Sequence, residues 1–216
     1  IPLDALLDAG RYFLNKQNKS TAVSDSQLIH IAVKSLGLDE MYPFNKNEKI
    51  IEYLIDTDSK LVDKRIIDFV DEVSMDSPAP GGGSVSAVAA SMSAALISMV
   101  ANLSFNKKEF HSKKKTINQI GEKAQKLKNE FLSLVDLDTL AFNDLMNAFR
   151  LPRKTDTENK FRDNQILAMT KLVTEVPLKT LEKAEELMDF HYKNLLLLPS
   201  FQKAFFLYHQ QYFFLC

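Results

Sequence analysis

The sequence predicts an all-α protein, a helical bundle. Apolar residues recur at steps of three and four along almost the whole chain, which is the spacing of one face of a helix. No segment shows the alternation of a convincing β-strand. The 30 residues from Ser77 to Asn106 contain no charge and are rich in Ala and Ser. Small residues allow neighbouring helices to approach closely, so this stretch predicts a central helix of the bundle.

The first sixty residues predict three helices and a linker. After a first helix at the start, Ser24 or Asp25 caps a second helix, which Gly37 ends. A third and shorter helix is expected over 45–55. The polar run 56–60 is typical of a linker between domains.

Longer helices are predicted for the rest of the chain. They are expected over 59–73, from a cap at Ser84 to about Phe105, over 112–149, over 159–175 and over 177–188. Pro177 suits the first position of the last helix. Beyond Asp189, the last acidic residue, nine of the 21 aromatic residues fall within 27 positions. We expect 189–216 to be a tail without a structural role.

Composition excludes several classes of function. The net charge is −1, so no overall field favours nucleic acid or a membrane surface. The one Cys stands at position 216, which rules out a disulfide framework and a cysteine-based metal site. The four His residues show no metal-ligand spacing. The uncharged stretch has the length of a membrane span, but Ala, Ser and Gly transfer weakly into lipid, which favours the soluble bundle.

A run of three glycines is the most local feature of the composition. Gly81, Gly82 and Gly83 are half of the six Gly in the chain, and Pro78 and Pro80 precede them. Such a turn before a helix leaves backbone N–H groups without partners at the positive end of the helix, where a carboxylate or a polar ring can bind. No Gly-Lys-Ser/Thr follows, which disfavours a phosphate loop. The alternative is a tight turn that lets two helices pack.

A carboxylate interrupts the apolar face of the long helix over 112–149. That face steps through Ala124, Leu127, Phe131, Leu134, position 138, Ala141, Leu145 and Phe149. Position 138 is Asp138, and burying a carboxylate is costly unless it is paired, so Asp138 is a candidate general acid or base. The alternative is a structural carboxylate bonded to Ser or Lys in the core. Asp136 lies about 200° around the helix and is expected to face solvent or a flank.

A basic stretch precedes and enters the same helix. Its members are Lys107, Lys108, Lys113, Lys114, Lys115, Lys123, Lys126 and Lys128. These side chains are suited to steering a polyanionic substrate, and a solvated helix face is the simpler interpretation.

Several blocks of the sequence resemble one enzyme family. The run Ser77-Pro-Ala-Pro-Gly-Gly-Gly-Ser-Val-Ser-Ala, with its Ala/Ser-rich continuation, is similar to the cyclodeaminase domain of formimidoyltransferase-cyclodeaminase. The further similar blocks are 134–142 and 148–152, and, for the end of the transferase domain, 1–9, 36–39 and 50–54. The resemblance covers about residues 1–188, and the glycine block is its most specific part.

The resemblance implies an architecture and an assembly. It divides the chain into the C-terminal helices of an α/β transferase domain over 1–55, a linker over 56–60, a truncated all-helical cyclodeaminase domain over 61–188 and a non-family tail over 189–216. It also implies a cytosolic homo-oligomer, a dimer within a ring-shaped octamer, with Golgi or centrosome association in the family. Neither a nucleic-acid partner nor a membrane span is expected.

The resemblance further implies an activity and its residues. The family releases ammonia from 5-formiminotetrahydrofolate to give 5,10-methenyltetrahydrofolate in histidine degradation, without a metal. Its acid matches Asp138. We expect Gly81–Gly83 and Ser84 to cradle the pterin or its carboxylate end. Arg150 is the candidate for the glutamate tail, and the basic stretch would steer a polyglutamylated substrate.

The chain departs from the family pattern at both ends. The catalytic half of the transferase is missing, so transferase activity is not expected, and the family's helices after about Met188 are replaced by the aromatic tail. We therefore expect low or no turnover. Two alternatives stay open: a methenyltetrahydrofolate cyclohydrolase, which the transferase-like segment before Tyr53 argues against, and a non-catalytic helical product that pairs with full-length subunits.

Overall fold

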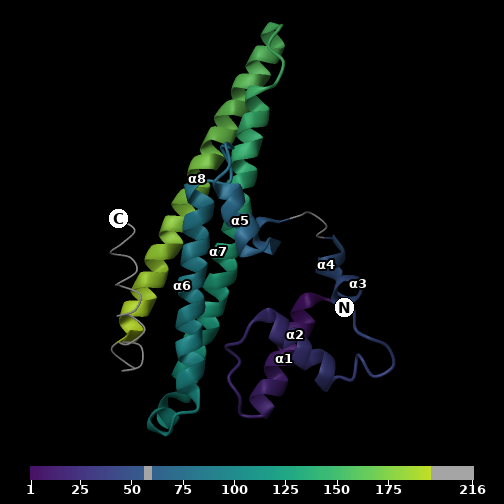
Figure 1. Ribbon diagram of the computed structural model, residues 1–216, viewed down its shortest axis with the longest axis vertical. Coiled ribbons are helices and arrows are strands. Elements are labelled where there is room, and N and C mark those ends of the chain that lie inside the picture. The colour runs from purple at the N-terminus through teal and green to yellow at the C-terminus, as the bar shows by residue number, and fades with distance from the viewer. Residues whose placement is uncertain (56–59, 196–216) are drawn as a thin grey trace. The chain divides into compact units, whose positions relative to one another are not determined.

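The computed structural model describes residues 1–55 and 60–195, and all its regular elements in those residues are helices (Figure 1). The predicted all-α class is therefore confirmed. The elements are α1 (Leu3–Lys16), α2 (Asp25–Ser35), α3 (Lys46–Lys49), α4 (Ile51–Ile55), η1 (Leu61–Asp63), α5 (Ile66–Val73), α6 (Gly82–Phe105), η2 (Lys108–Lys113), α7 (Lys114–Phe149) and α8 (Asp156–Leu195), where η marks a 3-10 helix.

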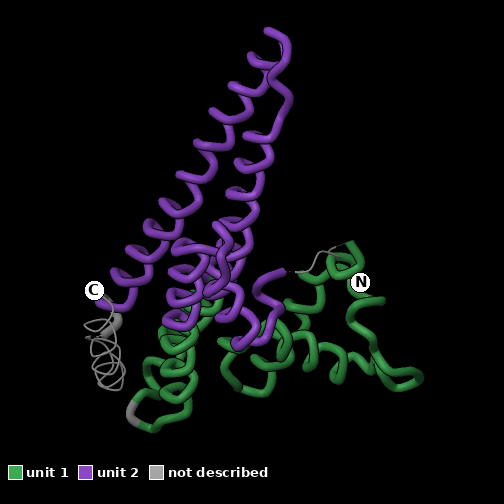
Figure 2. The backbone as a smooth tube through the Cα atoms, turned by 45° about the horizontal axis from the view of Figure 1, so that its top comes forward, with its two compact units in different colours: residues 1–59, 95–126, 194–216 green, residues 60–94, 127–193 purple. Residues whose placement is uncertain are grey.

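The chain divides into two compact units, shown in different colours in Figure 2. Of the described residues, the first unit holds 1–55, 95–126 and 194–195, and the second holds 60–94 and 127–193. Helices α6 and α7 each contribute to both units. The predicted domain boundaries stay a prediction, because most of the linker and the tail beyond 195 lie outside the described residues.

In the first unit, α1 and α2 pack with their backbones in close contact. Leucines of α1 and aliphatic residues of α2 form one apolar cluster: Leu6, Leu7, Leu14, Leu28, Ile29, Ala32 and Val33. A Cβ built at Gly10 would lie 2.8 Å from the carbonyl carbon of Leu28, and nearer still to its oxygen, so only glycine fits there. Ser24 caps α2 and forms a reciprocal capping box with Gln27. Gly37, at φ 67°, follows the end of α2 as predicted.

The first unit also contains a docked segment, residues 20–22, seated on α6 and α7. The Ala22 side chain is 0% exposed, and its carbonyl accepts from Asn102 Nδ2 at 2.6 Å. The Thr21 N–H donates to Asn118 Oδ1 at 2.9 Å, and the Thr21 hydroxyl donates to Glu122. A Cβ built at Gly121 would overlap that of Ala22, so a glycine lets the segment reach the helix.

In the second unit, α8 runs back along α7 (Figure 1). The ion pair between Lys183 and Glu130, at 2.7 Å, and the hydrogen bond from Arg162 Nη2 to Phe149 O, at 3.3 Å, tie the two helices together. The apolar face predicted for α7 is buried to 9% exposure or less at Ala124, Leu127, Phe131, Leu134, Ala141 and Leu145. Phe149, the last residue of α7, is 46% exposed and departs from the prediction.

Four predictions about helices were wrong. The single helix expected over 45–55 is split into α3 and α4. Helix α6 begins at Gly82, so Ser84 lies inside its first turn and is not its cap. The expected helix over 59–73 is split into η1 and α5. Helix α8 is continuous through Pro177, whereas two helices were expected. The ring of Pro177 removes one N–H from α8, and the buried face formed by Val176, Thr180 and Leu187 keeps the helix intact. Because α8 reaches Leu195, the start of the predicted tail is helical, and the rest of the tail lies outside the described residues.

Helix α6 is long and apolar enough to cross a membrane by length and composition, and 56% of its most apolar window is buried within the protein. The core helix of a soluble bundle passes the same test.

Candidate active site

The Asp138 carboxylate accepts hydrogen bonds at the N-terminus of α6. Asp138 is half-buried in the second half of α7. Its Oδ2 accepts from the backbone N–H of Ser84 at 2.8 Å and from the Ser84 hydroxyl at 2.9 Å. The first hydrogen bond of α6 runs from Val85 N to Gly81 O, so the N–H of Ser84 has no partner within the helix. The N–H at this helix start therefore binds a carboxylate of the protein itself, and the binding of a ligand by the glycine-rich loop stays a prediction.

The Ser84 hydroxyl is enclosed among oxygen atoms. Ser84 is 0% exposed, and its Oγ lies 3.1 Å from Val135 O and 3.2 Å from Thr139 Oγ1, in addition to Asp138. The side chain therefore holds α7 from inside the protein. In this structure it presents no atom to a ligand in solvent.

The three glycines of the loop differ in their surroundings. A Cβ built at Gly83 would lie 2.7 Å from Asp138 Oδ2 and closer still to Oδ1, so a side chain there would displace the carboxylate. At Gly82 a Cβ would meet nothing within 4 Å, and at Gly81 only Pro78 O, at 3.7 Å. Only Gly83 is required by a close approach, which supports the packing-turn interpretation at that position. Gly82 is exposed.

Arg150 is not brought to this site. It is exposed, directly after the end of α7, and its N–H donates to Asn147 O at 3.0 Å. Twelve residues separate it from Asp138, or about 18 Å along a helix axis. A role for Arg150 in binding the glutamate tail stays a prediction.

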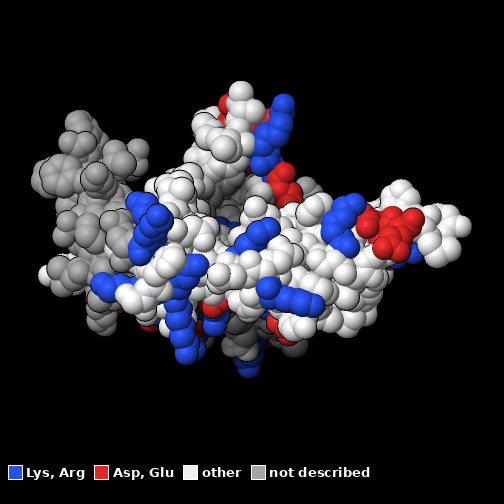
Figure 3. Space-filling view, turned by 90° about the horizontal axis from the view of Figure 1, so that it is seen from below, with Lys and Arg blue, Asp and Glu red and all other residues white. Residues whose placement is uncertain are grey.

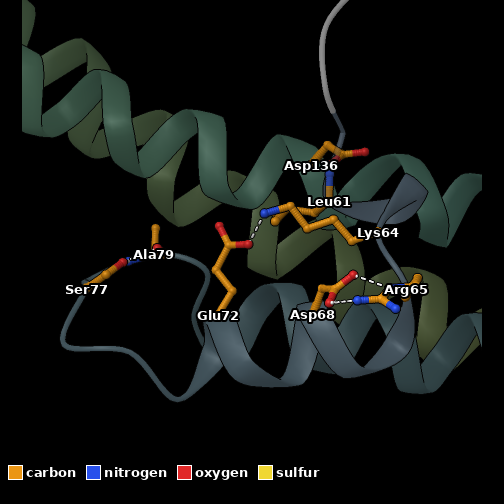
Figure 4. A network of polar contacts seen from close by, with 8 residues as sticks. All are labelled: Leu61, Lys64, Arg65, Asp68, Glu72, Ser77, Ala79 and Asp136. Atoms are coloured by element: carbon orange, nitrogen blue, oxygen red, sulfur yellow. Dashed lines mark hydrogen bonds and ion pairs between the residues drawn. The ribbon is translucent and has the colours of Figure 1, made fainter.

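Asp136 is a second partly buried carboxylate of α7 (Figure 4). Its Oδ1 accepts from the N–H of Leu61 at 2.7 Å, which fixes the start of η1. Burial raises the pKa of the Asp136 carboxyl, while backbone hydrogen bonds from Leu61 and Val62 act in the opposite direction. The sequence placed Asp136 at solvent or on a flank and missed this contact, because a backbone N–H 75 residues away has no signature in the pattern.

Ion pairs fix the segment between η1 and the glycines (Figure 4). Arg65 Nε and Nη2 donate to the two carboxylate oxygens of Asp68, each at 2.7 Å, and this pairing lowers the pKa of Asp68. Lys64 pairs with Glu72 in the last turns of α5. This segment leads into the buried Pro80 and then into the glycines.

The basic stretch surrounds the connection between α6 and α7. Figure 3 looks at the chain from the side where that connection lies, and shows Lys and Arg side chains standing apart from one another on the surface. Lys114 Nζ lies over the ring of Phe105, 4.9 Å from its centroid. Among residues 1–55 and 60–195, no group of three or more His, Cys, Asp or Glu is placed to hold a metal ion.

Comparison with known proteins gives the family. The fold and the site define a class of protein: an all-helical protein in which a carboxylate of one helix accepts hydrogen bonds at the N-terminus of another. A model described as formiminotransferase-cyclodeaminase matches residues 65–196, and one described as formiminotransferase domain matches residues 1–56. The chain belongs to the formiminotransferase-cyclodeaminase family. The match runs to residue 196, past the end expected near 188.

Curated relatives agree with this assignment. Formimidoyltransferase-cyclodeaminase of Gallus gallus is 36% identical over 206 residues, which is 90% of this chain and 37% of the relative. The protein of that name from Rattus norvegicus is 35% identical over 190 residues, 87% of this chain and 35% of the relative. A methenyltetrahydrofolate cyclohydrolase of Methylorubrum extorquens is 35% identical over 121 residues, 56% of this chain and 58% of the relative. The chain therefore spans little more than a third of the formimidoyltransferase-cyclodeaminases that it matches.

Proposed function

We propose that the chain carries a formimidoyltetrahydrofolate cyclodeaminase site, which converts 5-formiminotetrahydrofolate to 5,10-methenyltetrahydrofolate and ammonia in histidine degradation and one-carbon metabolism. The observation that carries the proposal is the Asp138 carboxylate, half-buried and fixed by two hydrogen bonds from Ser84. It lies in the part of the chain that the family model matches.

The reaction needs a group that moves one proton between two nitrogens. N10 of the folate attacks the formimino carbon and loses its proton, the carbon–nitrogen bond to the amine breaks, and the amine leaves as ammonia after gaining a proton. One carboxylate that first accepts the proton from N10 and then donates it to the amine balances both steps. In its ionised form it also attracts the positively charged amidinium.

Asp138 is suited to that exchange because its two oxygens have different surroundings. Both hydrogen bonds from Ser84 end on Oδ2. Within the described residues Oδ1 accepts no hydrogen bond, and it lies against Gly83. We assign Oδ1 as the atom that accepts and returns the proton.

The residues proposed to bind substrate divide into two kinds. Gly82 is exposed with open space above it, and Gly81 is half-buried, so their backbone groups are the ones assigned to contact the pterin. Ser84 and Gly83 hold Asp138 from within. The tetrahydrofolate derivative is the only small molecule that the proposal requires, and a polyglutamate tail near the basic stretch stays a prediction.

A methenyltetrahydrofolate cyclohydrolase is the second candidate, and the bacterial relative of that name favours it. Here water attacks the methenyl carbon and releases one proton. The hydroxyl group so formed then gives up its proton as the bond from this carbon to one folate nitrogen breaks, and that nitrogen takes up a proton, which leaves a formyl folate. The same carboxylate would act as the base. Ammonia release therefore separates the two candidates.

The test is an assay of ammonia release and of 5,10-methenyltetrahydrofolate absorbance on 5-formiminotetrahydrofolate, made with a full-length version of the protein because low turnover is expected of this chain. The variants are Asp138→Asn and the control Asp144→Asn, the same substitution at an exposed position of α7. Asp138→Asn keeps the size and removes the acid, so turnover should fall about 10²–10⁴-fold. Asp144→Asn should retain turnover, because Asp144 is exposed. Turnover within a few-fold of the native rate in Asp138→Asn would show that the assignment is wrong.

Binding separates both enzymes from a non-catalytic product. Calorimetric titration with 5-formyltetrahydrofolate, a stable folate, should show binding to the native chain and to Asp138→Asn. Absence of binding to a folded chain would favour the helical product that pairs with full-length subunits. The low turnover, the octamer and the cytosolic location expected from the sequence stay predictions.

A further inference from the structure

Three oxygen atoms lie within hydrogen-bond distance of the Ser84 hydroxyl, which has a single proton to donate. A hydroxyl group has one proton to donate and two lone pairs to accept with. Around Ser84 Oγ, Asp138 Oδ2 lies at 2.9 Å, Val135 O at 3.1 Å and Thr139 Oγ1 at 3.2 Å. The carbonyl and an ionised carboxylate can only accept, so the single proton of Ser84 serves one of them at a time.

The charge of Asp138 decides which acceptor takes that proton. An ionised carboxylate is the stronger acceptor, and it is also the nearer one, so the Ser84 proton goes to Oδ2. Ser84 Oγ then accepts from Thr139, whose hydroxyl supplies the other proton. When Asp138 takes up a proton on Oδ1, Val135 O remains as an alternative acceptor for Ser84. The buried hydroxyl is therefore satisfied in both charge states.

The structure assigns Ser84 and Thr139 as positioning residues of the Asp138 site: Thr139 donates to Ser84, and Ser84 donates to Oδ2, which leaves Oδ1 as the atom that exchanges the proton. The assignment rests on the proposed function. Asp138 makes no ion pair within the described residues, so the donors of Ser84 are what hold its charge. Thr139 follows Asp138 directly on α7, and Ser84 of α6 lies within hydrogen-bond distance of both side chains.

The experiment compares Ser84→Ala, Thr139→Val and the conservative Thr139→Ser. One measurement is the ¹³C chemical shift of the Asp138 carboxyl carbon at a single pH, with its signal assigned by its loss in Asp138→Asn. Ser84→Ala removes one of the two hydrogen bonds to Oδ2, so the signal should move. Thr139→Val should move the signal less in the same direction, and Thr139→Ser should leave it unchanged.

The second measurement is turnover of 5-formiminotetrahydrofolate. In Ser84→Ala and Thr139→Val, kcat should fall while KM stays close to native, because neither hydroxyl contacts substrate. Thr139→Ser should restore kcat. A change in KM alone, with kcat retained, would contradict a positioning role.

The outcomes are separable. An unmoved carboxyl signal in a folded Ser84→Ala overturns the inference. Should Ser84→Ala fail to fold, as judged by circular dichroism, the half-buried Thr139 decides: equal carboxyl signals in Thr139→Val and Thr139→Ser overturn it. Absence of turnover in the full-length version argues against the proposed function, whereas the carboxyl signal still decides the hydroxyl chain.

Discussion

Each unit contains a glycine at which an added side chain would overlap a residue of another helix or segment. In the second unit Gly83 admits the Asp138 carboxylate, and in the first Gly121 admits the Ala22 methyl group. The neighbours differ in mobility: a carboxylate is the far end of a rotatable side chain, whereas the Ala22 methyl is fixed to the backbone. A side chain added at Gly83 should therefore disturb chemistry, and one added at Gly121 should disturb folding.

The polar contacts of the two places also differ. Around residues 20–22, hydroxyl and amide groups bond to one another: Ser20 donates to Asn102 Oδ1 at 2.6 Å, and Asn118 Nδ2 donates to Thr21 Oγ1 at 2.6 Å. The Glu122 carboxylate accepts from both Thr21 and Asn118. At Asp138, Oδ2 accepts two hydrogen bonds and, within the described residues, Oδ1 accepts none. A satisfied network stabilises one conformation, and an unoccupied oxygen is what proton transfer requires.

The largest expected effect is on turnover in Gly83→Ala. The added methyl group overlaps Asp138 Oδ1 and forces the carboxylate away from Ser84. A displacement of about 1 Å costs about 10²-fold in rate. The unfolding free energy should stay within about 1 kcal/mol of native, because alanine is favoured over glycine in a helix. Ammonia release and urea unfolding measure the two effects.

The comparison variant is Gly82→Ala, one residue earlier in the same helical turn, where the added methyl group would meet no atom of Asp138. Equal loss of turnover in both variants would mean that the loop backbone, and not the position of Asp138, limits the reaction.

The next effect is on stability in Gly121→Ala. Its methyl group overlaps that of Ala22 and would lie 3.2 Å from the Ala101 Cβ, so the docked segment must shift. Overpacking of this kind costs about 1–3 kcal/mol, measured by urea unfolding. The double variant Ala22→Gly/Gly121→Ala removes the overlap and should recover part of that loss. Additive effects of the two substitutions would contradict direct contact between these positions.

The smallest effect is a pH dependence at Asp136. Burial raises the pKa of its carboxyl above 3.8, so the folded chain holds this proton more tightly than the unfolded chain does. The contribution of that proton to stability is complete below about pH 4 and is lost as pH rises through the raised pKa of the folded state. The stability of the native chain relative to Asp136→Asn should therefore fall between pH 4 and pH 7. Urea midpoints of both proteins at several pH values test this, and a difference that grows with pH would contradict it.

Sequence pattern alone predicted the helical class, a cap at Ser24 or Asp25, and a carboxylate at position 138 of the apolar face. Each of these leaves a local signal in the sequence: the helical period, a cap residue or a charge among apolar residues. It did not predict Thr139 or Asp136 as functional neighbours. Their partners, Ser84 and Leu61, lie 55 and 75 residues away, and only the packing of the helices brings them together. Pro177 was taken as a helix start, because local propensity does not include the packing that carries α8 through it.

The open space above Gly82 makes that position suitable for a chemical reporter. The chain has one cysteine, Cys216, so Gly82→Cys in a Cys216→Ser background would provide a single thiol next to the site. A fluorophore attached there would have to move when the proposed substrate contacts Gly82. Its emission would then follow the arrival and departure of ligand in real time, separately from turnover.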